Sequence, residues 1–509
     1  MSSCKLVFEK HEEPEPPGTP MLERNGGVHN APAGTPPHVV IAGENLHALQ
    51  LLQKDYTGLV DAIYIDPPYN SGAATWRYNN RYHERGDTDK HSRWLSFMQR
   101  RLELAKPLLN PENSVLIVTI DEKEYLRLGL LLEQTFPEAR IQMVSSVINP
   151  SAVARANELR RSDEYIYLVM FGDIAPAAME LGPEWGSGES VQSKLRWNGL
   201  MRSGTNARRV DRPRMFYPIF IERKEDGPVI HSLGDPFDGD IRGYAGTPNG
   251  CVAVWPIRSD GSEGNWQVSK ESLLGLMDQG YVKLGNWRLG RTSISYLKRG
   301  EQQKIEDGVF PVTGHAADGS VVVDESSYIP QFVPGTQWRI PSHNAGGAGG
   351  STLLRGMMPD RRFPFPKSLY AVEDALRFFV SDKPDALILD FFAGSGTTAH
   401  AVMRLNAEDG GRRRSISISN NEVGPDEAKA LREAGHMPGD PDWEALGICD
   451  HITKPRLRAA ITGVTPAGEP IKGRYSYNRE ADMADGMEAT VEFYNLRYED
   501  VVVSPDLAK

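Results

Sequence analysis

The chain has 509 residues, 39% of them hydrophobic, which is enough for two to four domains with buried cores. Its formal net charge of -11 argues against a protein that coats nucleic acid through a uniformly basic surface, although a local basic groove stays open. The three cysteines, Cys4, Cys251 and Cys449, are too widely separated for a paired-cysteine zinc site or a disulfide framework. No apolar run reaches membrane-spanning length and the start lacks the apolar core of a signal peptide, so we expect a cytoplasmic protein.

Residues 1–36 are rich in Pro, Glu and Gly, which predicts an N-terminal arm with little regular structure. Apolar runs of strand length then alternate with amphipathic helical patterns over residues 37–180. This alternation predicts an α/β fold with a mostly parallel sheet and helices on both of its faces. The expected strands are 38–41, 60–65, 115–120, 141–147 and 165–171, and the expected helices are 45–53, 95–109 and 121–136.

The alternation is interrupted over residues 181–355, where Gly, Pro, Trp and charged residues surround short strand-like pieces. We interpret this stretch as an inserted domain that ends in the glycine-rich linker 344–350. The alternating pattern returns over residues 356–465, and residues 466–509 form a C-terminal extension. In this second half the expected helices are 369–380 and 397–406, and the expected strands are 386–391 and 415–419.

The strand expected over 60–65 is followed by the motif Asp66-Pro67-Pro68-Tyr69. In an open parallel sheet, ligands bind at this carboxyl edge. The carboxylate of Asp66 and the carbonyl of Pro67 would each accept one hydrogen bond from the exocyclic amine of a base, whose lone pair is otherwise delocalised into the ring. Consecutive prolines fix that carbonyl, and Tyr69 offers a ring on which an extruded base stacks. The alternative is an ordinary turn, because Asp and Pro are common turn residues.

A second motif follows the strand expected over 386–391 and opens a helix. It consists of Asp390, Phe391, Phe392, Ala393, Gly394, Ser395, Gly396, Thr397 and Thr398. Its glycines let the backbone approach a nucleoside cofactor closely. The spacing of Gly394, Gly396 and Ala399 also fits a nicotinamide dinucleotide site, with Glu422 near the ribose, and a purely structural turn is a further alternative. The two motifs together favour methyl transfer to an amine, because a dehydrogenase has no evident use for the Asp-Pro-Pro-Tyr acceptors.

With these motifs in this order, the chain resembles the β-class amino-DNA methyltransferases, in particular the modification subunits of type III restriction-modification systems. The resemblance covers about residues 38–180 and 330–465. Besides the glycine motif, it rests on Ile63-Tyr64-Ile65-Asp66-Pro67-Pro68-Tyr69-Asn70-Ser71-Gly72, His91-Ser92-Arg93-Trp94-Leu95 and Phe365-Pro366-Lys367-Ser368. It implies a Rossmann-like, S-adenosylmethionine-dependent methyltransferase sheet in permuted order, with a target-recognition domain inserted over 181–355.

The resemblance also implies the cofactor, S-adenosyl-L-methionine, and a methyl transfer without a metal. Asp66 to Tyr69 would hold the base, Lys367 and Ser368 would approach the methionine end, and the glycine motif would line the cofactor pocket. The full expected cofactor set is Lys367, Ser368, Asp390, Phe391, Phe392, Ala393, Gly394, Ser395, Gly396, Thr397, Thr398 and Glu422. The residue that meets the ribose stays open, because Asn420 and Asn421 precede Glu422 where the family often has an acid. Asp at the first position of the amine motif favours the N6 amine of adenine over N4 of cytosine.

Two basic stretches are candidate DNA contacts. The first lies within Lys194–Lys224, and its tentative phosphate-binding residues are Arg196, Arg202, Arg208, Arg209, Arg212 and Arg214. A solvated loop is the alternative. The second is the polar loop 71–91, which we interpret as a flap over the flipped nucleotide. Its His83 and His91 lack a ligand cluster, so we expect them to be exposed or hydrogen-bonded.

The expected partners are double-stranded DNA, a restriction subunit with nuclease and helicase activity, and a second copy in a homodimer. The segment after residue 465 is shorter than in a full type III modification subunit, which weighs against docking of the restriction subunit. Two other functions stay open: methylation of N4-cytosine or of an RNA base, and a non-catalytic role that only delivers the restriction subunit to DNA. The intact Asp66, Tyr69 and glycine motif argue against the non-catalytic role.

Overall fold

The computed structural model describes residues 5–70, 89–153, 157, 159–185, 195–326, 328, 331–477 and 480–499. The chain divides into two compact units. The first consists of Met1–Gly188 and Gln331–Lys509, and the second is Glu189–Pro330. Residues 181–188 and 331–355, which the sequence analysis assigned to the inserted domain, therefore belong to the first unit. Among the described helices, none has the length and hydrophobicity to cross a membrane.

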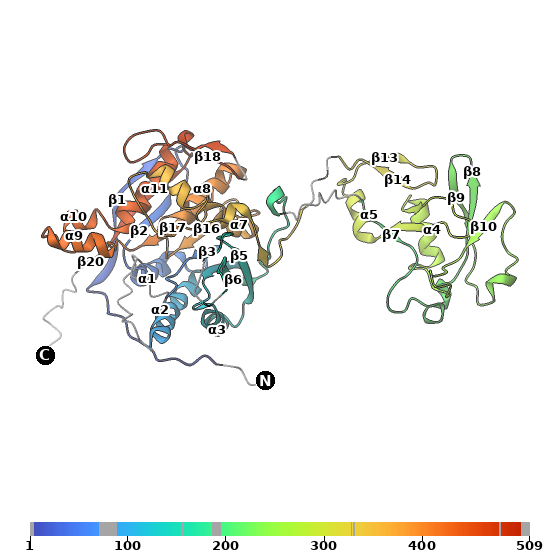
Figure 1. Ribbon diagram of the computed structural model, residues 1–509, viewed down its shortest axis with the longest axis horizontal. Helices are drawn as coiled ribbons and strands as arrows, with labels where there is room; N and C mark the ends of the chain where they lie inside the picture. The colour runs from blue at the N-terminus through green and yellow to red at the C-terminus, as the bar shows by residue number, and fades with distance from the viewer. Residues whose placement is uncertain are drawn as a thin grey trace. The chain divides into compact units, whose positions relative to one another are not determined.

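A ten-stranded mixed sheet forms the centre of the first unit, with the strand order β1-β20-β2-β17-β16-β3-β4-β6-β5-β15 (Figure 1). The strands from β20 to β4 are parallel to their neighbours, whereas β1 pairs antiparallel with β20 and β6 pairs antiparallel with β4 and β5. The α/β prediction is confirmed. The strands are β1 (Thr19–His29), β2 (His38–Ala42), β3 (Ala62–Ile65), β4 (Asn113–Ile120), β5 (Arg140–Val147), β6 (Asp163–Gly172), β15 (Gln337–Trp338), β16 (Leu387–Asp390), β17 (Arg414–Ser419) and β20 (Thr490–Glu499).

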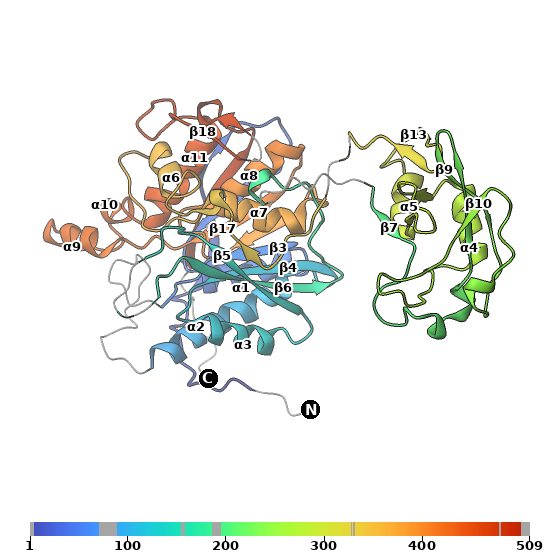
Figure 2. The same ribbon diagram turned by 45° about the vertical axis from the view of Figure 1, so that its right-hand side comes forward.

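Helices cover both faces of this sheet, as Figure 2 shows. One face packs against α1 (Asn45–Tyr56), α2 (Lys90–Ala105) and α3 (Tyr125–Thr135), and the other packs against α6 (Ser351–Met357), α7 (Leu369–Val380), α8 (Thr397–Asp409) and α11 (Lys454–Thr462). Side chains of a strand alternate between the faces, so Tyr64 enters one core while Ile63 and Ile65 enter the other. The shorter elements α9 (Pro425–Glu433), α10 (Pro441–Glu444), β18 (Arg474–Tyr475) and β19 (Ala481–Asp482) complete this unit.

Both chain ends contribute more structure than the sequence suggests. Strand β1 lies within the expected arm, and β20 lies within the expected C-terminal extension, yet the two pair along their length. Strand β20 also pairs with β2, which places it inside the sheet. Ahead of β1, Glu13 forms two hydrogen bonds with the buried Arg101 of α2, at 2.8 and 3.0 Å. The arm therefore packs as part of the first unit.

The second unit is built from two three-stranded antiparallel sheets and a hairpin. The two sheets share a core with α4, in which Tyr217 and Trp266 are buried. The elements are β7 (Trp197–Gly199), β8 (Ile219–Lys224), β9 (Gly227–Leu233), β10 (Cys251–Val254), α4 (Lys270–Asp278), β11 (Val282–Leu284), β12 (Ile294–Leu297), α5 (Arg299–Glu306), β13 (Val312–His315) and β14 (Val321–Val323).

Candidate active site

The two sequence motifs meet at one edge of the sheet. Strands β3 and β16 are parallel neighbours, so Asp66, which follows β3, lies beside Asp390 at the end of β16. A cavity of about 590 Å³ opens between them, and it is also lined by the segment before α7. The residues that line it are Tyr64, Asp66, Phe363, Pro364, Phe365, Pro366, Lys367, Asp390, Phe392, Ala393, Gly394, Ser395, Thr397 and Thr398.

Asp66 is held by two donors. The hydroxyl of Thr119, on β4, donates to Asp66 Oδ1 at 2.6 Å, and Lys367 Nζ lies 3.2 Å from the same oxygen. Next in the motif, the carbonyl of Pro68 accepts a 2.6 Å hydrogen bond from the indole of Trp94. These contacts fix the carboxylate and the proline turn, so the acceptors are positioned by the fold itself.

Lys367 joins Asp66 to two further groups. Its ammonium contacts the hydroxyl of Tyr69 and the carboxylate of Glu164, and it lies 4.8 Å from the centre of the Tyr69 ring. Burial by itself lowers the pKa of Lys367, but the charges of Asp66 and Glu164 outweigh it and raise that pKa. Burial, together with the same two carboxylates, raises the pKa of Tyr69 well above its usual value. At neutral pH the lysine is therefore a cation and the tyrosine is uncharged.

A second buried carboxylate, Glu124, links Asn70, which directly follows the amine motif, to His91 in the first turn of α2. Its Oε1 accepts a 2.5 Å hydrogen bond from Asn70 Nδ2 and lies 2.5 Å from His91 Nδ1. Glu124 is the N-cap residue of α3, but its side chain makes no cap hydrogen bond. Most of the predicted flap, including Arg77, Arg81, His83 and Arg85, lies outside the described residues.

The glycine turn needs its glycines for conformational reasons. Gly394 and Gly396 have φ values of 49° and 78°, which other residues rarely adopt. A Cβ at Gly396 would also lie 3.2 Å from Thr453 Cγ2. The buried carboxylate of Asp390 closes the turn: it accepts hydrogen bonds from the Phe392 amide at 2.9 Å and the Thr398 hydroxyl at 2.5 Å. Burial raises the pKa of Asp390 to about 7.

Residues from beyond the motif also support the turn. Asn45 donates to the carbonyl of Phe391 at 2.8 Å, and Thr453 donates to the carbonyl of Gly394 at 2.5 Å. The buried guanidinium of Arg456 donates to the hydroxyls of Ser395 at 2.9 Å and Thr397 at 2.7 Å. Burial lowers the pKa of Arg456 to about 10. A single buried polar residue of this kind leaves no periodic signal in a sequence, so these supports were not predicted.

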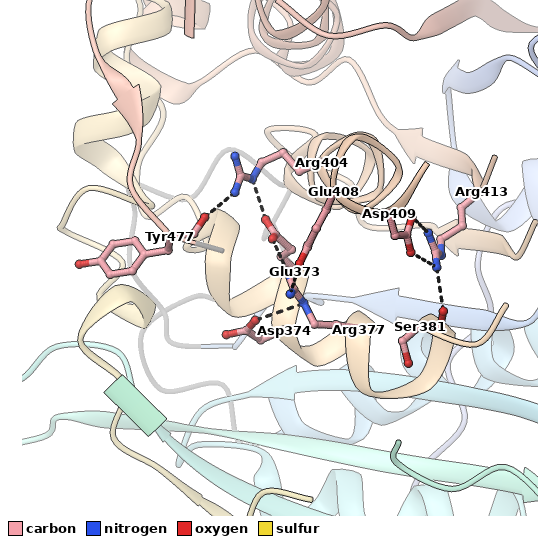
Figure 3. Close-up of polar contacts among 9 residues, drawn as sticks. All are labelled: Glu373, Asp374, Arg377, Ser381, Arg404, Glu408, Asp409, Arg413 and Tyr477. Carbon is pink, nitrogen blue, oxygen red and sulfur yellow. Dashed lines mark hydrogen bonds and ion pairs between the residues drawn. The ribbon is translucent and has the colours of Figure 1, made fainter. Parts of the chain in front are cut away.

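The helices that begin at the two sides of the cavity are joined by buried ion pairs (Figure 3). Helix α7 starts directly after Ser368, and α8 starts directly after Gly396. Glu373 of α7 accepts from Arg377 at 2.6 Å and from Arg404 of α8 at 2.7 Å. Arg404 donates onward to the carbonyl of Tyr477 at 2.7 Å, and Arg377 pairs with Glu408 of α8 at 2.6 Å. This network fixes the lysine segment relative to the glycine turn.

A family model described as "DNA methylase" matches residues 60–208 and 281–429, which include both motifs and are more than half of the chain. The chain belongs to the DNA methylase family. The predicted resemblance to amino-DNA methyltransferases is therefore confirmed.

Two curated relatives and one solved structure are similar to this DNA methylase. The type II methyltransferase M.KpnI of Klebsiella pneumoniae is 28% identical, over 75% of this chain and 80% of the relative. The type III restriction-modification enzyme EcoPI Mod subunit of Escherichia phage P1 is 27% identical, over 76% of this chain and 58% of the subunit. The crystal structure of the M1.HpyAVI–SAM complex is 11% identical, covers 75% of this chain and 93% of that one, and has a TM-score of 0.30.

Several predicted cofactor residues of this DNA methylase lie beside the cavity rather than on its wall. The hydroxyl of Ser368 donates to the carbonyl of Ser342 at 2.8 Å, so it fixes the start of α7. The ring of Phe391 is buried in the core on the α2 side. Glu422, after β17, is not among the lining residues, and Asn421 donates to the carbonyl of Glu444 at 2.8 Å.

The arginines predicted to contact DNA lie in the second unit and differ in how far they are exposed. Arg209 is committed to the fold: its guanidinium pairs with Glu263 at 2.9 Å, donates to the carbonyl of Phe237 at 2.7 Å and lies 4.1 Å from the ring centre of Phe216. Arg202 and Arg212 are half-buried, and Arg196, Arg208 and Arg214 are exposed. Lys194, at the start of the basic run, lies outside the described residues.

Proposed function

We propose that this DNA methylase transfers a methyl group from S-adenosyl-L-methionine to the exocyclic N6 amine of adenine at a specific sequence in double-stranded DNA. The observation that carries the proposal is the single cavity that joins the amine-acceptor motif to the glycine turn. One of its relatives is named as the Mod subunit of a type III restriction-modification enzyme, and another as a type II methyltransferase. We therefore propose that it is the modification enzyme of a restriction-modification system in the cytoplasm, with a restriction subunit as its partner.

The residues around the cavity suit this cofactor. The left-handed backbone at Gly394 lets the turn approach a nucleoside closely, and the ring of Phe392 lines the same wall. We propose that Phe392 to Ser395 hold the cofactor, with Lys367 at its methionine end. When bound, S-adenosylmethionine supplies a methyl group on a positively charged sulfur. The oxygen and aromatic groups on the opposite wall are suited to an amine and a base, so no metal is required.

Asp66 and Pro67 act on the amine by orientation. Each accepts one N–H hydrogen bond, which holds the nitrogen pyramidal and directs its lone pair into the cavity. Thr119 and Lys367 both contact Asp66 Oδ1, so little reorganisation is needed when the base arrives. Asp at the first position of the motif favours adenine as the base. We propose that the exposed Arg196, Arg208 and Arg214 contact DNA phosphates and that Arg209 does not.

The decisive experiment is Asp66→Ala. Because the lost group orients the amine and not the cofactor, we expect methyl transfer to fall by at least about 10²–10³-fold, while binding of S-adenosylmethionine is retained. Transfer is measured with radiolabelled cofactor on unmethylated DNA, and binding by calorimetry. Near-normal turnover would remove Asp66 from the mechanism.

Analysis of the product tests the remaining parts of the proposal. Mass spectrometry of nucleosides from treated DNA should show N6-methyladenine, whereas N4-methylcytosine would assign the enzyme to the other amine. Asp61→Asn is a matched control for the Asp66→Ala variant. Asp61 precedes β3 where Asp66 follows it, and it also pairs with a lysine, Lys383, at 3.3 Å. If the wild-type protein methylates neither base, the non-catalytic role is the better explanation.

A further inference from the structure

Glu164 is a buried acid outside both motifs that contacts Lys367 on the Asp66 side of the cavity, without lining the cavity itself. It stands near the start of β6, and its side chain is 4% exposed. Strand alternation places it on the same face of the sheet as Ile166, beneath the segment that carries Lys367. Its Oε2 accepts hydrogen bonds from the ammonium of Lys367 and, at 3.1 Å, from the hydroxyl of Tyr69.

Among the residues that the structure describes, this end of the cavity holds more negative than positive charge. Asp66 and Glu164 both contact Lys367, so two carboxylates share one ammonium. The other charged groups lie at the glycine turn, where Asp390 receives two hydrogen bonds and Arg456 donates to Ser395 and Thr397. Burial raises the pKa of Asp390 to about 7, which reduces its charge at neutral pH. The surplus negative charge therefore belongs to Asp66 and Glu164.

A second buried carboxylate on one lysine is costly unless a further positive charge compensates it. The fold alone requires only one carboxylate to neutralise Lys367. A ligand with a positive charge beside Asp66 would balance the second. The methyl donor of the proposed function carries such a charge on sulfur, and the demethylated product, a thioether, does not.

We propose that Glu164 is a specificity-determining residue that makes the cavity prefer the cationic methyl donor over its neutral product. The inference rests on the proposed function. When the S–CH3 bond breaks and the N–CH3 bond forms, the positive charge passes from sulfur to the amine nitrogen and leaves with an amine proton that is released to water. The carboxylates therefore keep their charge through the reaction, whereas the cofactor loses its own. Glu164 therefore favours binding of the donor before transfer and release of the product after it.

The test measures two affinities by calorimetry on the whole chain, one for S-adenosylmethionine and one for S-adenosylhomocysteine. The quantity compared is the ratio of the first affinity to the second. Glu164→Gln keeps the shape of the side chain and removes its charge. We expect it to weaken binding of S-adenosylmethionine about tenfold relative to S-adenosylhomocysteine, the effect of deleting one nearby charge in a partly buried site. Asp61→Asn removes the charge of a lysine-paired acid at the opposite end of β3, and should leave the ratio unchanged.

A merely structural role for Glu164 predicts that both ligands weaken equally, and that result would overturn the proposal. Lys367→Met provides an independent test if the glutamine variant does not fold, because removing the cation should change the ratio in the opposite direction, towards S-adenosylmethionine. If the ratio of S-adenosylmethionine affinity to S-adenosylhomocysteine affinity stays constant or falls in the Lys367→Met variant, the proposal is also overturned. If the wild-type protein binds neither ligand, the proposed function fails; if it binds both and the ratio is insensitive to these changes, only the role of Glu164 fails.

Discussion

Asp390 shows how one residue can serve both the fold and the site. Its carboxylate closes the glycine turn, and burial raises its pKa to about 7 from the ordinary value of 3.8. Between these two values the folded protein keeps a proton that the unfolded chain has lost. The stability from this proton is fully present below about pH 4 and is lost as the pH rises through about 7.

We therefore expect Asp390→Asn to gain stability relative to the wild-type protein as the pH rises. The amide oxygen can still accept from Phe392, but no carboxylate has to ionise in the buried turn. Urea unfolding midpoints at pH 5 and pH 8 measure the effect, since the difference between variant and wild type should shift in favour of the variant at pH 8. Parallel pH profiles would mean that Asp390 is not the titrating group.

At the scale of single residues, the sequence predicts the site where several unusual residues stand together. Asp66 and Gly394 were found because each belongs to a run of residues at a strand end, and the structure places both on one cavity. Glu164, Thr119 and Arg456 were not found. Each is a lone polar residue in or near an apolar element, and only the packing of the chain shows which group it meets.

At the scale of elements, helices α7 and α8 determine the spacing between Lys367 and the glycine turn. Their contact is more polar than either sequence pattern suggests, because Glu373 is fully buried between the guanidinium groups of Arg377 and Arg404. Arg404 pairs with this carboxylate, and Arg377 pairs with both Glu373 and Glu408. The network therefore ties the stability of the unit to the geometry of the cavity.

We expect Glu373→Ala to lower the free energy of unfolding by about 3 to 5 kcal/mol, because it removes a fully buried carboxylate from between two guanidinium groups. The neighbouring Glu408 pairs with Arg377 from a more exposed position, 31% exposed, so Glu408→Ala should cost no more than about 1 kcal/mol. Chemical denaturation followed by circular dichroism compares the two. Equal losses would show that burial of Glu373 is not the source of its effect.

The pattern of the sequence predicts elements well where strands are apolar throughout. The interior strands β3, β4, β16 and β17 all lie within or close to the predicted ranges, because burial on both faces leaves a continuous apolar run. Strand β1 was missed for the opposite reason. Its residues are of mixed polarity, include two glycines and are exposed or half-buried, so neither alternation nor an apolar run identifies it.

At the scale of the whole molecule, the chain segments of the first unit that precede and follow the insertion pair with each other. Met179 and Phe332 pair through two backbone hydrogen bonds, at 3.1 and 2.8 Å, just before and just after the insertion. The sequence placed the end of the insertion near residue 355, because residues 331–355 have no regular pattern. In the structure Trp338 of that stretch is buried in the core of the first unit.

Because Met179 and Phe332, which precede and follow the insertion, pair with each other, we expect replacement of Glu189–Pro330 by a short Gly-Ser linker to leave the first unit folded and able to bind S-adenosylmethionine. Methylation at the specific DNA site should fall by about a hundredfold or more, since recognition contacts are lost. Circular dichroism, calorimetry and a methylation assay test these expectations on the shortened and full-length proteins. Retention of sequence-specific methylation would locate DNA recognition in the first unit instead.

Strand β20 has a consequence for the order in which the protein is made. It lies between β1 and β2, so two strands from the first tenth of the chain are joined by a strand near its end. Until the ribosome has released residue 499, β2 has an open edge and β1 has no partner. This edge is exposed to pairing with other chains during synthesis, and its closure is the last step in completing the sheet.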